Sequence, residues 1–231
     1  MKYAKLAITV MLGLILSITA FAALIKAQGG YPPYHAGYFF YNKSVTYAFG
    51  VSGKIYTINP EVPATPNDYF YQWVTVMISY KYGYWIQLGY LKSLVKPLSQ
   101  SVPTMNFYIE IVDEQGPPRH IYPDPVPQEG ITYTYKIIPA FSDNKWKCII
   151  EKGAEIIYEG LEETNPFNCV DLQAFSETSM EEINIDGTHF SKLSYFTGRG
   201  FPLWNHHVPH ADPPYYVEEI TDYEFYAYGG G

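Results

Sequence analysis

Apolar and polar residues alternate along most of the chain with a period of two, which is typical of β-strands with one solvent-exposed face. These runs are separated by clusters of Gly, Pro, Asn and Asp such as NPEVPATPND and SDNK. Many short strands at this spacing predict an all-β antiparallel sandwich or barrel, and we expect a sandwich over residues 36–196. The main runs are FFYNKSVTYAFGV, YFYQWVTVMISY, YWIQLGYLKSL, NFYIEIVDE, TYTYKIIPAF, KWKCIIEK and EIIYEGL.

The composition strengthens this interpretation and narrows the class of partner. The 231 residues include 24 Tyr, 18 Gly and 18 Pro, and these types favour half-buried pleated surfaces and turns. The formal net charge of -8 argues against nucleic acid as a partner, because phosphate binding needs a basic surface. The chain contains no phosphate-loop or dinucleotide motif, so we expect no cofactor.

The N-terminal residues 1–27 have the pattern of an export signal. Lys2 and Lys5 precede an uncharged apolar stretch, and AFA at residues 20–22 offers a small-x-small cleavage site. The stretch is also long enough for an uncleaved membrane anchor, with the lysines inside. Either alternative predicts a secreted or cell-surface protein that touches the membrane only through this helix. Residues 28–35 form a Gly/Pro/Tyr linker.

Export gives two further expectations for the mature chain. Cys148 and Cys169 are an even pair, so we expect a disulfide between them. The NKS sequon makes Asn42 a candidate for glycosylation.

The C-terminal residues 197–231 change in character and are rich in Pro, His and Tyr. We expect a tail with one strand, YYVEEI, that wraps over the sandwich or reaches a partner. Its NHHVPHAD stretch contains His206, His207, His210 and Asp212. These ligand types suit Zn²⁺ or Cu²⁺, but a Pro-rich loop lacks helical ligand spacing. We therefore expect no metal site, with His206 and His210 only as weak candidates.

Three segments taken in order resemble the glutamic peptidases, or eqolisins. QWVTVMISYKYGYWIQLGY is similar to their W-V-G-I-D and I-L-Q-T-G strand pair, and FYIEIVD is similar to their W-Y-E-W-Y-P strand. ETSMEEINID is similar to their E-T-N-A-E-W-I-V-E-D segment. The resemblance covers roughly residues 69–186. It implies a concanavalin A-like, jelly-roll β-sandwich with a substrate groove on the concave face of one sheet.

The resemblance also implies a catalytic pair made of one Gln and one Glu. Gln87 matches the glutamine of Q-T-G and Glu181 the glutamate of A-E-W, while Glu110 matches the acidic residue of W-Y-E-W. A carboxylate can activate water and return its proton to the departing nitrogen, and a primary amide can stabilise the oxyanion without titrating. The implied function is that of a secreted acid endopeptidase with polypeptide substrates.

Several positions depart from the family pattern and leave alternatives open. Phe107 and Ile111 stand where the family has tryptophans, and Leu88 replaces a threonine. Glu182 replaces another tryptophan and is a second candidate for the carboxylate, because neighbouring strand residues face opposite ways. A carboxylate pair such as Glu110 and Glu181 would also suit glycoside cleavage. The rival class is a non-catalytic surface, filament, virion or carbohydrate-binding component, with copies of itself or surface glycans as partners.

Overall fold

The computed structural model describes residues 33–40, 48–94 and 102–231, which form two antiparallel sheets of seven strands each. The first sheet has the strand order β12-β1-β10-β3-β4-β5-β6. Its strands, in that order, are Val208–Ala211, Tyr34–Phe40, Asp171–Thr178, Tyr69–Ser79, Tyr84–Ser93, Thr104–Val112 and Arg119–Ile121. The all-β sandwich predicted from the alternating runs is therefore confirmed.

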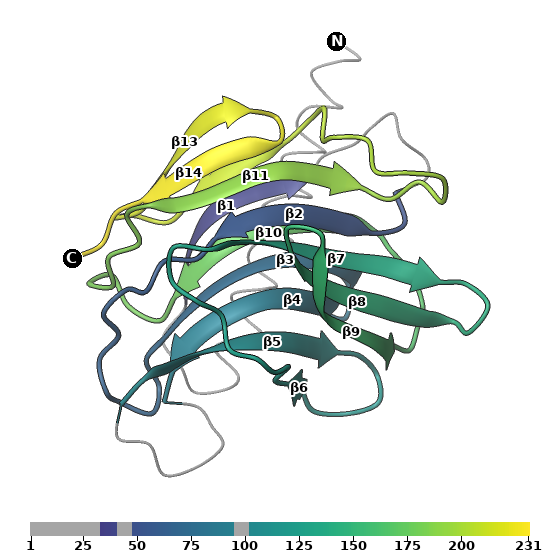
Figure 1. The fold of residues 1–231 in the computed structure, drawn as a ribbon, viewed down its shortest axis with the longest axis horizontal. Coiled ribbons are helices and arrows are strands. Elements are labelled where there is room, and N and C mark those ends of the chain that lie inside the picture. The colour runs from purple at the N-terminus through teal and green to yellow at the C-terminus, as the bar shows by residue number, and fades with distance from the viewer. Residues whose placement is uncertain (1–32, 41–47, 95–101) are drawn as a thin grey trace.

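The second sheet has the strand order β13-β14-β11-β2-β7-β8-β9. Figure 1 shows the C-terminal strands β13 and β14, in yellow, beside β11 and on the side of the molecule opposite β6. The strands of the second sheet, in order, are Tyr216–Thr221, Glu224–Tyr228, Thr188–Tyr195, Val51–Tyr56, Thr132–Ala140, Lys145–Lys152 and Glu155–Glu163.

The main core lies between the sheets, where alternate residues of the strands pack together. On β4, Ile86, Leu88 and Tyr90 are fully buried in the main core cluster, where Ile109 of β5 also lies. Burying one such side chain is worth about 1.5–3 kcal/mol. Trp146 of β8 is buried in the same cluster, and its indole N–H donates to Oγ1 of Thr164 at 2.9 Å.

The C-terminal segment completes both sheets. The predicted strand in YYVEEI is present as β13, but β12 and β14 flank it in sequence. β12 pairs with β1 at the edge of the first sheet, and β14 pairs with β11 in the second. The sandwich therefore continues to Tyr228 and does not end at residue 196.

The predicted disulfide between Cys148 and Cys169 is absent, and both residues are free thiols. Cys148 lies on β8, opposite Ile137 of β7, and is fully buried between the sheets. Cys169 is half-buried in the loop before β10, where its thiol contacts the carbonyl oxygen of Asp171 at 4.0 Å.

The predicted export helix over residues 1–27, most of the linker over 28–35, and Asn42 lie outside the described residues. In the part of the chain that the structure describes, no helix is long and apolar enough to cross a membrane.

Candidate active site

A row of polar side chains crosses the first sheet on the face turned away from the second sheet. Gln87 of β4 lies directly opposite Glu110 of β5 and, on its other side, opposite Thr75 of β3. The row continues to Gln173 of β10 and to His120 of β6. Directly opposite residues in antiparallel strands share a face, with Cβ atoms about 5 Å apart. Gln87 and Glu110 are therefore immediate neighbours.

Aromatic residues surround this row on the same face. Trp73, Tyr108 and Phe175 are each 1% exposed and form a cluster that is separate from the main core. Gly89 lies between Trp73 and Tyr108 in the strand register. A Cβ atom there would meet the carbonyl oxygen of Gln72, so glycine permits the close approach of the backbone at this point.

The amide of Gln87 is oriented by a tyrosine from the neighbouring strand. The hydroxyl of Tyr108 donates to Oε1 of Gln87 at 3.4 Å, and Gln87 is 5% exposed. With Oε1 used as an acceptor, the two N–H donors of the amide are available to an oxygen atom placed over the sheet. An amide held in this way can donate hydrogen bonds to a bound oxygen atom.

Burial strongly alters the acidity of Glu110. Burial raises its pKa to about 7, the hydrogen bond from Trp85 lowers it, and the negative charge of Glu177 raises it. Trp85 Nε1 donates to Oε1 of Glu110 at 2.9 Å, and His120 Nε2 lies 3.5 Å from Oε2. A carboxyl group with a pKa near 7 can both give and take a proton at neutral pH.

A second carboxyl group, Glu177 of β10, lies on the same face. Its Oε2 accepts a hydrogen bond from Trp73 Nε1 at 3.1 Å and lies 3.8 Å from His35 Nε2. In the strand register Glu177 is opposite Tyr71. Burial raises the pKa of Tyr71 well above its usual value, and the negative charges of Glu110 and Glu177 raise it further. Two carboxyl groups therefore flank one aromatic surface.

The structure does not bring Glu181 to Gln87. Glu181 and Glu182 are exposed in the turn between β10 and β11, beyond the end of the strand at Thr178. Glu182 lines a cleft at the end of the sandwich instead. Of the four carboxyl and amide groups predicted for the site, only Gln87 and Glu110 lie opposite one another on the first sheet.

The strand register favours another alignment of the third family segment. If DLQAFSET of β10 is matched to N-A-E-W-I-V-E-D, Gln173 takes the position of the catalytic glutamate and Glu177 that of the second glutamate. This alignment places Gln173 in the same row as Gln87. The chain then carries an amide where the family motif has its catalytic carboxylate.

The histidines of the C-terminal segment join strands together. His210 Nε2 lies 3.3 Å from Oδ1 of Asp212, whose Oδ2 lies 3.3 Å from His35 Nδ1. His207 lies 2.6 Å from Glu219 and 2.8 Å from Asp222, whereas His206 is exposed. Among the described residues, no group of three or more His, Cys, Asp or Glu is arranged to hold a metal ion.

Sequence reasoning missed Glu177, Tyr108, Trp85 and His120. The alternation in DLQAFSET gives Gln173 and Glu177 one shared face, and the same rule places Trp85 on the face of Gln87. His120 follows a loop, and no local pattern indicates that β6 pairs with β5.

Comparisons with known proteins agree with the fold. No protein-family model and no curated protein sequence matches this chain. Two crystal structures of scytalido-glutamic peptidase, one with a peptide-based transition state analog and one with a transition state analog inhibitor, match with TM-scores of 0.58 and 0.57. Both are 11% identical and cover 85% of this chain and 98% of theirs.

SCP-B, a member of the Eqolisin family of peptidases solved with the tripeptide Ala-Ile-His, matches with a TM-score of 0.53 at 10% identity. It again covers 85% of this chain and 98% of its own. The chain therefore has the β-sandwich fold of these peptidases over most of its length.

Proposed function

We propose that the protein is a glutamic-peptidase-like hydrolase that cleaves polypeptides, with Gln87 as the oxyanion donor and Glu110 as the group that transfers the proton. The observation that carries this proposal is the direct pairing of Gln87 with Glu110 on one face of the first sheet. The fold shared with peptidases that bind peptide-like ligands supports a polypeptide substrate.

In this mechanism the substrate carbonyl oxygen lies against the amide of Gln87, which Tyr108 holds through Oε1. Glu110 takes a proton from water as the water attacks the carbonyl carbon, and then gives that proton to the leaving nitrogen. The developing negative charge on the oxygen is stabilised by the amide N–H groups, which do not titrate.

The acidity of Glu110 changes the expected pH range. Because burial raises its pKa to about 7, Glu110 carries a proton over most of the acidic range and ionises near neutrality. The free enzyme therefore has a working base only as the pH approaches and passes 7. We infer an activity that rises toward neutral pH, in place of the acid optimum implied by the family resemblance.

The test is cleavage of a denatured protein substrate from pH 3 to pH 9. Gln87→Ala and Glu110→Gln are expected to lose activity by about 10²-fold or more, the usual effect of removing an oxyanion donor or an essential base. Glu181→Gln is the matched control and is expected to retain wild-type activity. If Glu181→Gln is inactive while Glu110→Gln is active, the assignment of Glu110 is wrong.

A second candidate function is a non-catalytic extracellular sandwich. The observation that favours it is Gln173, which occupies the row of Gln87 where the alternative alignment expects a carboxylate. A folded wild type with no cleavage at any pH would select this function. Binding of peptides, glycans or further copies of the chain would then be measured directly.

We also propose that the protein works outside the cytoplasm, as a secreted or cell-surface protein. The proposal rests on the basic and then apolar sequence of residues 1–27. Fractionation of cells expressing the full chain, with a chain lacking residues 2–25 as control, tests it. Recovery of the full chain in the cytoplasm would contradict it.

A further inference from the structure

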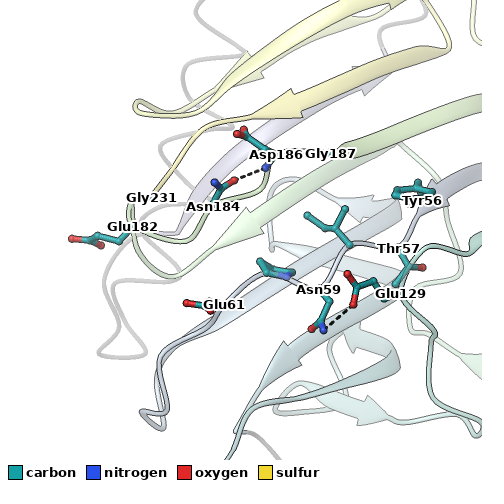
Figure 2. A pocket seen from close by; sticks show the side chains of 12 residues that line it. Tyr56, Thr57, Asn59, Glu61, Glu129, Glu182, Asn184, Asp186, Gly187 and Gly231 are labelled. Carbon is teal, nitrogen blue, oxygen red and sulfur yellow. Dashed lines mark hydrogen bonds between the residues drawn. The ribbon is translucent and has the colours of Figure 1, made fainter.

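A cleft of about 640 Å³ opens at the end of the sandwich, formed by loops of both sheets. Figure 2 shows Glu182, Asn184 and Asp186 of the loop between β10 and β11 on one side, with Asn59 and Glu129 on the other. The volume falls in the usual range for ligand sites. It does not contain any of the polar row around Gln87.

The cleft has a strongly acidic lining. Glu61, Glu129, Glu182 and Asp186 contribute four carboxylates. Within the described residues none of the four forms a salt bridge. The charges of Glu61 and Glu129 act on Lys92, whose Nζ donates to Oδ1 of Asn59 at 2.8 Å and to the carbonyl oxygen of Pro60 at 2.6 Å, so one cation stands against four carboxylates. Such a surface attracts a positively charged ligand.

A buried hydroxyl group adds an independent sign of a missing partner. Thr57 lines the cleft and is fully buried, and its Oγ1 has no hydrogen-bond partner. Its backbone is already paired, with the N–H donating to Ile131 and the carbonyl accepting from Gly130. An unsatisfied buried hydroxyl typically costs about 1–3 kcal/mol, so a ligand that bonds to it gains affinity.

The walls of the cleft are held in place before any ligand binds. The backbone N–H of Ile58 donates to the hydroxyl of Tyr90 at 2.9 Å, and Tyr90 donates to Oε1 of Gln72 at 2.8 Å. Asn59 donates to Oε2 of Glu129 at 3.2 Å. A preformed site loses less entropy on binding.

The lining distinguishes between kinds of cation. The carboxylates come from separate segments, and among the described residues no three acidic or His/Cys groups are close enough to hold a metal ion. Tyr56, Ile58 and Pro60 add an apolar strip along the same cleft. Lysine and arginine side chains combine a long apolar stem with a charged head, and so match both features.

We propose that this cleft binds a basic polypeptide segment through its lysine or arginine side chains. The stem of the side chain packs on the apolar strip and the charged head reaches the carboxylates, with Thr57 as a further acceptor. The proposal is independent of catalysis at Gln87 and Glu110.

The experiment measures binding of a fluorescent Lys/Arg-rich peptide to the full chain at low and high salt. We expect binding that weakens as salt is added, since exposed charges are screened. A twin peptide with alanine at the basic positions is expected not to bind. Spermidine and calcium chloride are the competitors that represent small cations, and neither is expected to displace the peptide at equal charge concentration.

Two double variants provide the matched comparison. Glu61→Gln with Glu182→Gln is expected to weaken peptide binding about tenfold, the scale of two lost charge contacts. Glu155→Gln with Glu159→Gln removes the same charge from the exposed β9 and is expected to change affinity less than twofold. Thr57→Val is expected to weaken binding without lowering the melting temperature, because its methyl group replaces an unsatisfied hydroxyl.

The proposal is overturned if the two double variants weaken binding equally, since the attraction would then be diffuse. It is also overturned if the alanine twin binds as well as the basic peptide, or if spermidine or calcium displaces the peptide at low concentration. Unchanged affinity in Thr57→Val overturns the role of the hydroxyl.

Discussion

Trp85 and Gln87 lie two residues apart on β4, and the indole Nε1 of Trp85 donates a 2.9 Å hydrogen bond to Oε1 of Glu110, the residue opposite Gln87. One strand therefore supplies both the candidate oxyanion donor and the group that restrains the candidate base. Because a hydrogen bond to a carboxylate favours its charged form, Trp85 limits how far burial raises the pKa of Glu110.

Replacing Trp85 by Phe is expected to raise the pKa of Glu110 further above its present value of about 7. Carbon-13 NMR titration of labelled glutamate carboxyl groups measures this. Trp73→Phe is the control, because Trp73 donates to Glu177 and not to Glu110. A wild-type Glu110 that titrates near 4.5 would contradict the environment described for it.

Stability is expected to fall as the pH rises through the neutral range. Burial raises the pKa of both Glu110 and Asp171 to about 7, above their ordinary values of 4.5 and 3.8. A raised carboxyl pKa means that the folded state binds the proton more tightly than the unfolded state does. The protonated carboxyl group therefore stabilises the fold fully below the ordinary pKa, and this stabilisation is lost as the pH rises through the pKa of the folded state. The loss is on the order of 3 kcal/mol per carboxyl group.

Urea unfolding at pH 5 and pH 8 checks this dependence. Asp171→Asn and Glu110→Gln are each expected to reduce the difference between the two pH values, because neither amide ionises. Equal wild-type stability at pH 5 and pH 8 would show that these carboxyl groups are not buried as described.

The opposite sign is expected for Asp212. Burial raises its pKa, but hydrogen bonds with His210 and His35, and their charges, lower it well below the ordinary value of 3.8. The stabilisation from Asp212 is therefore present above about pH 4 and is lost as the pH falls below it.

Asp212→Asn is expected to lower the melting temperature at pH 7 by about 2–4 °C, the effect of roughly 1 kcal/mol in a chain of this size. Asp212 binds β12 to β1, because the backbone N–H of His35 donates to its Oδ2 at 2.9 Å. Asp222→Asn, which alters the contact to His207, is the comparison. A variant as stable as wild type at pH 7, with the same acid sensitivity, would exclude this role.

Both thiols are expected to resist alkylation in the native protein at pH 8. Burial raises the pKa of Cys169 to about 12 and that of Cys148 well above its usual value, so little reactive thiolate forms. Mass spectrometry after treatment with iodoacetamide is expected to show no label before unfolding and two after it. Detection of an oxidised pair in the native protein would instead support the disulfide predicted from the sequence.

The alternating pattern was sufficient to predict the sandwich and the face of Gln87. On β4 the residues Ile86, Leu88 and Tyr90 point to the core, so the intervening positions must lie on the other face. The family resemblance added Glu110, which lies opposite Gln87 on the neighbouring strand.

The position of the second carboxylate was not predictable from motif matching. ETSMEE contains three glutamates, and the end of β10 decides which of them lies on the sheet. The strand ends at Thr178, whose Oγ1 donates to the carbonyl oxygen of Met180 at 3.0 Å. The backbone N–H of Ser179 continues the pairing with β3 by one bond, to the carbonyl oxygen of Tyr69. Glu181 therefore lies beyond the paired residues, whereas Glu177 lies on the sheet.

Long-range pairing limited the prediction of the C-terminal segment in the same way. His35 and Asp212 are joined by hydrogen bonds across 177 positions of sequence. Local periodicity carries no information on which distant strand is the partner, so the three C-terminal strands could not be assigned to their sheets from sequence.

The last strands of the chain fill edge positions in both sheets, with β12 beside β1 and β13 and β14 beyond β11. These three strands follow all the others in the described sequence, whereas β1, the partner of β12, precedes them all. β12 therefore joins the first sheet only through residues far from it in sequence, and such non-local pairing slows folding.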